Sequence, residues 1–401
     1  MTTLALIVAR SLRQHALSTF ITALSVALAG GLLMSVWVVK TQSQTTFTQV
    51  NTGFDAVLGA RGSKLQLVLN AIFHLEASPG NVAAADYEFI KNHPAVKLAI
   101  PIAVGDNLRG YRIVGTVPEL FTDVEYVPGR KFTLSAGKPF DPAAKEAVLG
   151  DFVAGKLGLK VGDTFHPFHG LIFDEKNQHA ETYTVTGVLA PSNTPADKVI
   201  WIPLHGLQTM SGHDPRAATD VSAVLIQLKS PTAGFMLDMM YNKQGNRLTF
   251  AYPIGAIMAE LFQKIGWFDK VLTLVAYLVA FVSATGVLVA IYNSMAARRR
   301  DIAILRALGA GRLTLFGAIV IEAAVIGALG MAGAFAVYAV IVTAVATVIR
   351  AQTGVLLETF TYNPVMLWST LGMIVLCALC GLLPAWKAYR TDIAENLAPE
   401  S

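Results

Sequence analysis

The chain has 401 residues, of which 54% are hydrophobic and 14% charged, and its mean hydropathy is +0.52. This composition is too apolar for an ordinary soluble domain and too charged in its middle for a chain that lies wholly in the membrane. We therefore expect a membrane protein with a soluble domain, and the formal net charge of +4 gives no support to nucleic-acid binding.

Four apolar runs satisfy the length of about 20 residues that a helix needs to cross a hydrocarbon core. The predicted spans cover residues 16–40, 267–297, 313–349 and 364–386. A cleaved signal peptide is the alternative for the first run, because Ala27-Leu28-Ala29 resembles a cleavage site. The apolar stretch continues to Val39, which favours a span. The third run is too short for two spans and a turn, so we expect one long helix.

Basic residues predict the orientation of these spans. They precede the first span in the N-terminal segment 1–15, which reads as a short helix at or leading into the membrane. They recur in the 298–312 segment and in the tail 387–401, whereas the 350–363 loop has only Arg350. Both termini and residues 298–312 are thus expected in the cytoplasm, and residues 41–266 on the opposite side of the membrane.

Residues 41–266 have the pattern of one α+β domain. Helical stretches begin and end it, and short β-like runs separated by Gly and Pro fill residues 96–228. The domain contains no cysteine, so it must fold without a disulfide. The cysteines of the chain, Cys377 and Cys380, fall inside the fourth span and are interpreted as small packing residues.

Motifs for nucleotide hydrolysis or hydrolytic catalysis are absent from the sequence. The nearest fragment to a phosphate-binding loop is GARGSK at 59–64, which has Ser where the loop needs Lys. There is no G-x-S-x-G and no H-E-x-x-H. We therefore expect no enzymatic activity and no cofactor in this chain, and any work driven by ATP requires a partner.

One histidine cluster is a candidate metal site. FHPFHGLIFDEKNQHAETY brings His166, His169 and His179 close to Asp174 and Glu175 in sequence. Imidazole and carboxylate are suitable ligands for divalent transition metals. An exposed polar hairpin whose histidines bind nothing is the simpler interpretation, and the sequence leaves both open.

Glu322 is an ionisable residue about ten positions into the third span. A carboxylate there is costly, so it should face the bundle interior or a cavity. A role in transport or proton relay is one interpretation. The favoured one is a packing role, in which Glu322 pairs with a basic side chain or a helix end.

The polar segment at 298–312 predicts a short helix between two spans. Asp301 is a candidate cap, Ile302, Leu305 and Leu308 recur three residues apart, and Gly309 is a candidate stop. Such a helix has one apolar side and an arginine rim. It is either a docking surface for a cytoplasmic partner or an anchor that only fixes orientation.

The sequence AARRRDIAILRALGAGRLTLFGAIVIEAAVIGALG resembles the core of the FtsX-like permease family, the MacB/LolC/FtsX type of ABC transporter. ARSLRQHALSTFITALSVALAGGL is similar to the first span of that family, and PAWKAYRTDIAENLAP to its C-terminal signature. PGRKF, EAVLGDFVAGKLGLKVGDTF and YTVTGVL are similar to the MacB-like periplasmic core.

This resemblance implies a permease of the mechanotransmission type in the bacterial inner membrane. Its periplasmic domain, residues 41–266, is expected to move when a cytoplasmic ATPase closes. The resemblance also implies a homodimer or a heterodimer with a related permease, and a periplasmic binding or adaptor protein as a further partner. The chain lacks the ATPase that is fused in MacB, so a separate subunit must bind ATP and Mg²⁺. The implied coupling helix contains Arg299, Arg300, Asp301, Ile302, Ile304, Leu305, Arg306, Leu308 and Gly309.

The segment GARGSKLQLVLNAIFHLEASPGN departs from the MacB and LolC patterns, which puts the substrates of those proteins in doubt here. The alternative function is a regulator that transports nothing and activates a periplasmic partner such as a cell-wall hydrolase. The two functions share every cytoplasmic feature and differ in what residues 41–266 contact.

Overall fold

The computed structural model describes residues 3–48, 52–213, 215, 218–297, 299–307, 309–357 and 362–390. The chain divides into two compact units. The helical unit comprises Met1–Ser43, Ile265–Ala346 and Glu358–Ser401, and the α+β unit comprises Gln44–Lys264 and Thr347–Leu357.

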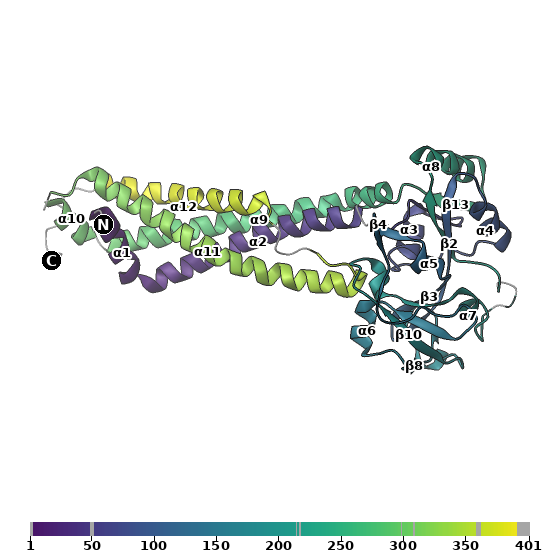
Figure 1. Cartoon of the computed structure of the whole chain (residues 1–401). Coiled ribbons are helices and arrows are strands. Elements are labelled where there is room, and N and C mark those ends of the chain that lie inside the picture. Colours follow the sequence, from purple (N-terminus) through teal and green to yellow (C-terminus); the bar gives the residue numbers. More distant parts are fainter. Residues whose placement is uncertain are drawn as a thin grey trace. The chain divides into compact units, whose positions relative to one another are not determined.

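Long helices dominate the helical unit (Figure 1). Its described helices, some of which continue into the other unit, are α1 (Thr3–Gln14), α2 (Ala16–Thr48), α9 (Ile254–Ala297), α10 (Arg299–Ala307), α11 (Arg312–Thr353) and α12 (Pro364–Arg390). Of the helices that the structure describes, α2, α9, α11 and α12 are long and apolar enough to cross a membrane. The prediction of one N-terminal and three C-terminal spans around an inserted α+β domain is confirmed.

Several helices are longer than the spans that hydropathy predicts. The helix α9 begins at Ile254, well before residue 267, and α2 continues to Thr48. The predicted third span is one helix, α11, of 42 residues. A hydropathy window detects only the part of a helix that lipid covers, so these polar extensions were not part of the predicted spans.

Small residues allow the spans to approach one another closely. A Cβ atom placed on Gly330 of α11 would lie 2.5 Å from Cβ of Val26 in α2. One placed on Gly327 would lie 2.9 Å from Cβ of Cys377 in α12, whose side chain is fully buried. Atoms of side chains do not approach so closely, so both contacts require glycine.

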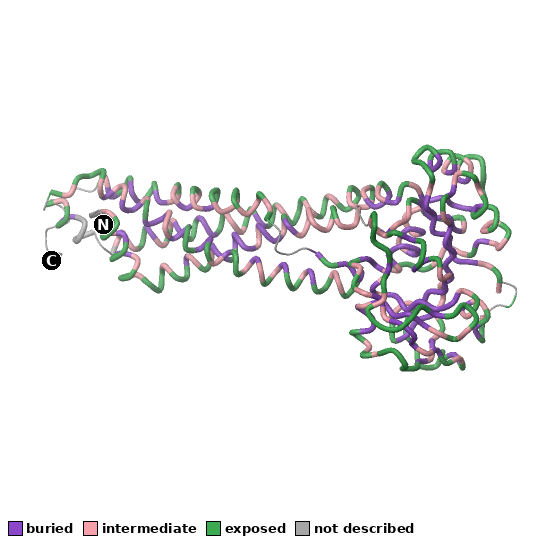
Figure 2. The backbone as a smooth tube through the Cα atoms, in the orientation of Figure 1, coloured by how far each residue is buried: buried purple, intermediate pink, exposed green. Residues whose placement is uncertain are grey.

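Many residues along the helices of the helical unit are exposed (Figure 2), and large apolar side chains are among them. Val282, Val340, Trp368 and Leu383 are between 66% and 70% exposed. Such a surface is unfavourable in water and favourable in hydrocarbon. It is the surface expected to contact lipid.

A mixed sheet of eleven strands forms the centre of the α+β unit. The strands are β1 (Ala56–Ala60), β2 (Val96–Leu108), β3 (Tyr111–Thr116), β6 (Leu134–Gly137), β7 (Glu146–Leu149), β8 (Thr164–Phe165), β9 (Phe168–His169), β10 (Tyr183–Leu189), β11 (Ile200–Pro203), β12 (Ala223–Leu228) and β13 (Leu248–Ala251). Their order is β13-β1-β12-β2-β3-β11-β7-β10-β6, with β8 on β10 and β9 on β2. The β11–β3 and β10–β7 pairs are parallel, and the other pairs are antiparallel. A separate hairpin contains β4 (Glu125–Val127) and β5 (Arg130–Lys131).

Short helices cover this sheet. They are α3 (Lys64–Ala71), α4 (Ala84–Lys91), α5 (Glu119–Thr122), α6 (Asp151–Leu157), α7 (Leu204–Gln208) and α8 (Pro231–Asp238), with a π-helical turn at Met239–Gln244 and 3-10 turns η1 (Glu175–Asn177) and η2 (Pro195–Lys198). Leu67 and Val68 of α3 are fully buried against the same core as Trp201 of β11. This packing explains the apolar run that follows Gly62 in the sequence.

The long strand β2 contains an irregularity that positions a buried carboxylate. Its pairing with β3 shifts register between Val104 and Asp106, so that Gly105 is an extra residue on the β2 side. A bulge of this kind changes the direction in which the following side chain points. The side chain of Asp106 is fully buried.

Candidate functional site

The helix α10 lies in the chain between the spans α9 and α11. Ala303 is buried in it, whereas Ile304 and Leu305 are 41% and 36% exposed. Large apolar side chains exposed on an otherwise polar helix are typical of a surface that binds a protein partner. The side chains of Arg299, Arg300, Asp301 and Ile302, and the whole of Leu308, lie outside the described residues.

The beginning of α10 differs from the prediction. The helix begins at Arg299, so Asp301 is its third residue and not the cap before it. The basic residues at the start are good helix formers, which allows the helix to extend beyond the aspartate.

Gly309 ends α10 in the way that the sequence predicts. Its φ is +100°, and its N–H donates to the carbonyl oxygen of Arg306 at 3.0 Å. The N–H of Ala310 donates to the carbonyl oxygen of Leu305 at 2.9 Å. These two bonds form a Schellman motif, which favours glycine at the left-handed position. Gly309 therefore determines where the chain leaves α10.

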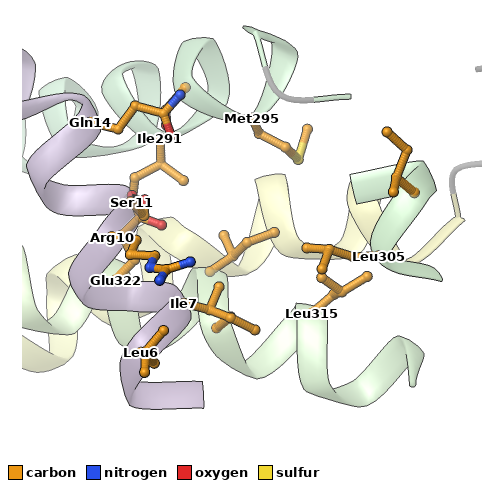
Figure 3. A pocket seen from close by; sticks show the side chains of 14 residues that line it. Leu6, Ile7, Arg10, Ser11, Gln14, Ile291, Met295, Leu305, Leu315 and Glu322 are labelled. Atoms are coloured by element: carbon orange, nitrogen blue, oxygen red, sulfur yellow. Dashed lines mark hydrogen bonds between the residues drawn. The ribbon is translucent and has the colours of Figure 1, made fainter. Parts of the chain in front are cut away.

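A cavity of about 420 Å³ lies among α1, α9, α10 and α11 (Figure 3). It is lined by Leu6, Ile7, Arg10, Ser11, Gln14, Ile291, Ser294, Met295, Ile304, Leu305, Leu315, Ala318, Ile319 and Glu322. Two residues of the predicted coupling helix, Ile304 and Leu305, thus border the same cavity as the predicted intramembrane carboxylate Glu322. No local sequence pattern indicates that these features lie together.

Glu322 is 9% exposed, and one of its carboxylate oxygens accepts a hydrogen bond from the hydroxyl of Ser11. Ser11 is 2% exposed. The bond therefore holds α1 against α11 inside the unit.

The structure brings together two of the three histidines predicted as metal ligands. The imidazole rings of His169 and His179 have centroids 5.5 Å apart. The Nδ1 atom of His166 instead lies 3.1 Å from the backbone oxygen of Glu181, and His166 is not in the cluster. Proximity in sequence therefore identified only part of the group.

The remaining members of the histidine cluster, Asp106 and His213, come from distant parts of the sequence. Asp106 is separated from His179 by 73 residues and from His213 by 107. The hydrogen bond to Asp106 raises the pKa of the His213 imidazole. Because the sheet and the loop after α7 bring these residues together, no local sequence pattern could have identified them.

The solved structures that match the chain include two domains at low sequence identity. The extracellular domain of the noncanonical ABC-type transporter YknZ from Gram-positive bacteria is 17% identical and has a TM-score of 0.29, with 48% of this chain and 97% of that one covered. The periplasmic region of MacB from Actinobacillus actinomycetemcomitans is 11% identical and has a TM-score of 0.35, with 53% and 94% covered. Among curated proteins, no sequence matches the chain.

Two family models match the sequence. The MacB-like periplasmic core domain matches residues 19–234, more than half of the chain. The FtsX-like permease C-terminal model matches residues 273–393, which include α10, α11 and α12. The models follow one another in the order that the four spans and the inserted α+β unit require. The chain therefore belongs to the FtsX-like, MacB-type family of ABC transporter permeases.

Proposed function

We propose that this chain is the membrane subunit of an ABC transporter that works by mechanotransmission. A separate cytoplasmic ATPase binds ATP and Mg²⁺, docks on α10, and moves the α+β unit on the other side of the membrane. The movement extrudes, extracts or hands on a substrate there. The observation that carries the proposal is the pair of exposed apolar side chains, Ile304 and Leu305, on a short helix between two spans.

The length of α11 supports this mechanism. The helix begins at Arg312, directly after the α10 segment, and continues without interruption to Thr353. At 1.5 Å per residue it is about 60 Å long. A continuous helix of this length can transmit a displacement at its first turn to its last.

Contacts within the α+β unit hold the last turns of α11. The Nζ atom of Lys198 donates to the carbonyl oxygen of Gln352 at 2.5 Å, and Arg350 forms an ion pair with Asp151 at 3.9 Å. Both contacts connect α11 to segments that pack on the sheet. A shift of α11 along its axis would therefore displace the part of the unit next to η2 and α6.

We further propose that the ATPase acts on two permease chains, either two copies of this one or this one with a related chain. Family membership supports this arrangement, because ABC transporters use paired membrane subunits. The lipid-exposed surface of the spans offers ample apolar area for such pairing.

The substitution Leu305→Asp tests the docking of the ATPase. A charge in a desolvated interface costs several kcal/mol, so we expect ATPase binding to weaken by at least about 100-fold. The measurement is recovery of the ATP-binding subunit and of ATP hydrolysis when the tagged chain is purified in mild detergent from cells that make its native partners. Val161→Asp is the matched control, because Val161 is 44% exposed and lies in the α+β unit.

Leu305 also lines the cavity, so the variant must first be shown to insert and to elute as a single species. The variant Leu305→Ala should still fold, and less of the ATPase should be recovered with it than with the parent chain. This result would separate a loss of docking from misfolding. Recovery of the ATPase with Leu305→Asp at the level of Val161→Asp would refute the proposal.

A further inference from the structure

One carboxylate oxygen in the α+β unit is surrounded by three imidazoles. The Oδ1 atom of Asp106 lies 3.3 Å from Nδ1 of His169, 3.2 Å from Nε2 of His179 and 3.1 Å from Nε2 of His213. The three ring centroids are between 5.1 and 5.5 Å apart. All four candidate ligand atoms lie within 4.8 Å of one another.

We propose that Asp106, His169, His179 and His213 form a binding site for one divalent transition-metal ion, with Zn²⁺ as the best fit. Three nitrogen donors and one carboxylate oxygen form a ligand set that suits zinc, whereas calcium and magnesium prefer oxygen donors alone.

The spacing of these atoms agrees with four-coordinate geometry. A tetrahedron with metal–ligand bonds of about 2.0–2.1 Å has edges of about 3.3 Å, and an octahedron with the same bonds has edges of about 2.9 Å. Two of the three observed oxygen–nitrogen separations, 3.2 and 3.3 Å, lie nearer the tetrahedral value, and the third, 3.1 Å, lies between the two values.

The second oxygen of Asp106 provides an independent observation. Its Oδ2 atom is buried and has no hydrogen-bond partner among the described residues, and the side chain as a whole is 0% exposed. A buried carboxylate with one unpaired oxygen is unfavourable unless a cation lies next to it. A metal ion at the centre of the group provides the missing positive charge.

The fold holds the four ligands by contacts outside the cluster. The bulge at Gly105 directs Asp106, and the antiparallel register of β2 and β9 places His169 opposite it. The side-chain amide of Asn107 donates to the carbonyl oxygen of Gly170 at 2.8 Å. This bond fixes the loop that carries His169.

The cluster also has a route by which an ion can enter. The side chain of His169 is 53% exposed, whereas those of His179 and His213 are 5% and 16% exposed. One ligand therefore faces solvent and three lie behind it. The acidic residues Asp174 and Glu175 are exposed nearby in sequence and are outside the ligand group.

A metal here would link three separate segments, because β2, residues 169–179 and the loop after α7 each contribute ligands. The α+β unit contains no cysteine, so it has no disulfide to join these segments. Ion binding should therefore raise the thermal stability of the unit, as any ligand of the folded state does.

The test uses the full chain in detergent, purified with an affinity tag that contains no histidine and stripped of metal with EDTA. We expect calorimetric titration to give one Zn²⁺ per chain, and added Co²⁺ to give the d–d absorption of a four-coordinate site. His169→Ala and His213→Ala should each weaken binding by roughly 100-fold or more, since even outer partners of metal ligands contribute about 10–100-fold. Zn²⁺ should raise the unfolding temperature of the parent protein and of neither variant.

His166→Ala is the matched control, because His166 belongs to the same loop and lies outside the cluster. It should bind Zn²⁺ as the parent protein does. His169 is mostly exposed, so its alanine variant should fold even if the His213 variant does not. Absence of stoichiometric binding, unchanged affinity in His169→Ala, or an equal loss in His166→Ala would overturn the proposal.

Discussion

A single buried imidazole shows how the α+β unit responds to pH. His74 has a left-handed backbone conformation with φ +54°, and its ring packs edge-on against Trp201 at 5.8 Å. Its Nδ1 atom is buried without a hydrogen-bond partner among the described residues. Burial, together with the positive charges of Arg112 and Lys198, lowers the pKa of His74 to about 3.

This lowered pKa predicts a loss of stability in acid. The unfolded chain binds the proton near the ordinary value of 6.5, whereas the folded chain does not bind it until the pH approaches 3. The free energy of unfolding therefore falls as the pH drops from about 6.5 to about 3, by at most about 1.4 kcal/mol per pH unit from this residue.

The variant His74→Asn tests this prediction, because asparagine tolerates the left-handed conformation and does not titrate. We expect the unfolding temperature, measured between about pH 7 and about pH 4, to depend less steeply on pH in this variant than in the parent protein. His205→Asn, a change at an exposed residue, is the control. Equal pH dependence in the parent and in His74→Asn would show that His74 is not the source.

At the same scale, the candidate sites show what sequence can and cannot predict about single residues. Gly309 was predicted as a helix stop because the conformation it adopts is open mainly to glycine. Asp106 was not predicted, because nothing in VGDNL distinguishes a strand aspartate that is buried from one that is exposed. Its role depends on a bulge and on loops that are distant in sequence.

At the scale of elements, hydropathy was sufficient to predict the four spans, because each has an apolar run of the required length. The α+β class was predicted from short alternating runs and was also confirmed. The order of the strands was not predicted. It depends on which strands pair across long sequence separations, and local sequence patterns do not determine that pairing. The outer turns of α2 and α9 lie beyond the runs that hydropathy predicts as spans.

Glycine at the contact of two spans leads to a prediction for the helix pair α2 and α11. In Gly330→Ala the new Cβ would lie 2.5 Å from Cβ of Val26 and 2.8 Å from the carbonyl oxygen of Ala23. The helices must then separate, which should lower the free energy of unfolding by roughly 1–3 kcal/mol. This loss should outweigh the helix propensity that alanine adds, about 1 kcal/mol.

Gly286→Ala in α9 is the matched control, because a Cβ there meets nothing within 4 Å. It gains the same propensity without the clash and should be neutral or slightly stabilising. Both variants are compared by thermal unfolding in the same detergent. Equal effects of the two substitutions would mean that close contact of α2 and α11 does not determine stability.

At the scale of the whole molecule, the proposed mechanism depends on which side of the membrane each unit occupies. The described basic residues Arg10, Arg13, Arg306, Arg312, Lys387 and Arg390 lie near the ends of helices where the chain leaves a span. Basic residues are retained on the cytoplasmic side, so α10 should face the cytoplasm and the α+β unit the opposite compartment. An ATPase could reach α10 only in this orientation.

Cysteine labelling tests the orientation directly. In a background of Cys377→Ser and Cys380→Ser, the variant Lys176→Cys places one thiol on an exposed loop of the α+β unit, and Ala307→Cys places one on an exposed position of α10. In intact spheroplasts a membrane-impermeant maleimide should label the first variant, and it should label the second only after the membrane is permeabilised. The reverse pattern would place α10 outside the cell, where no ATP-driven subunit could dock, and would contradict the orientation and the proposed function together.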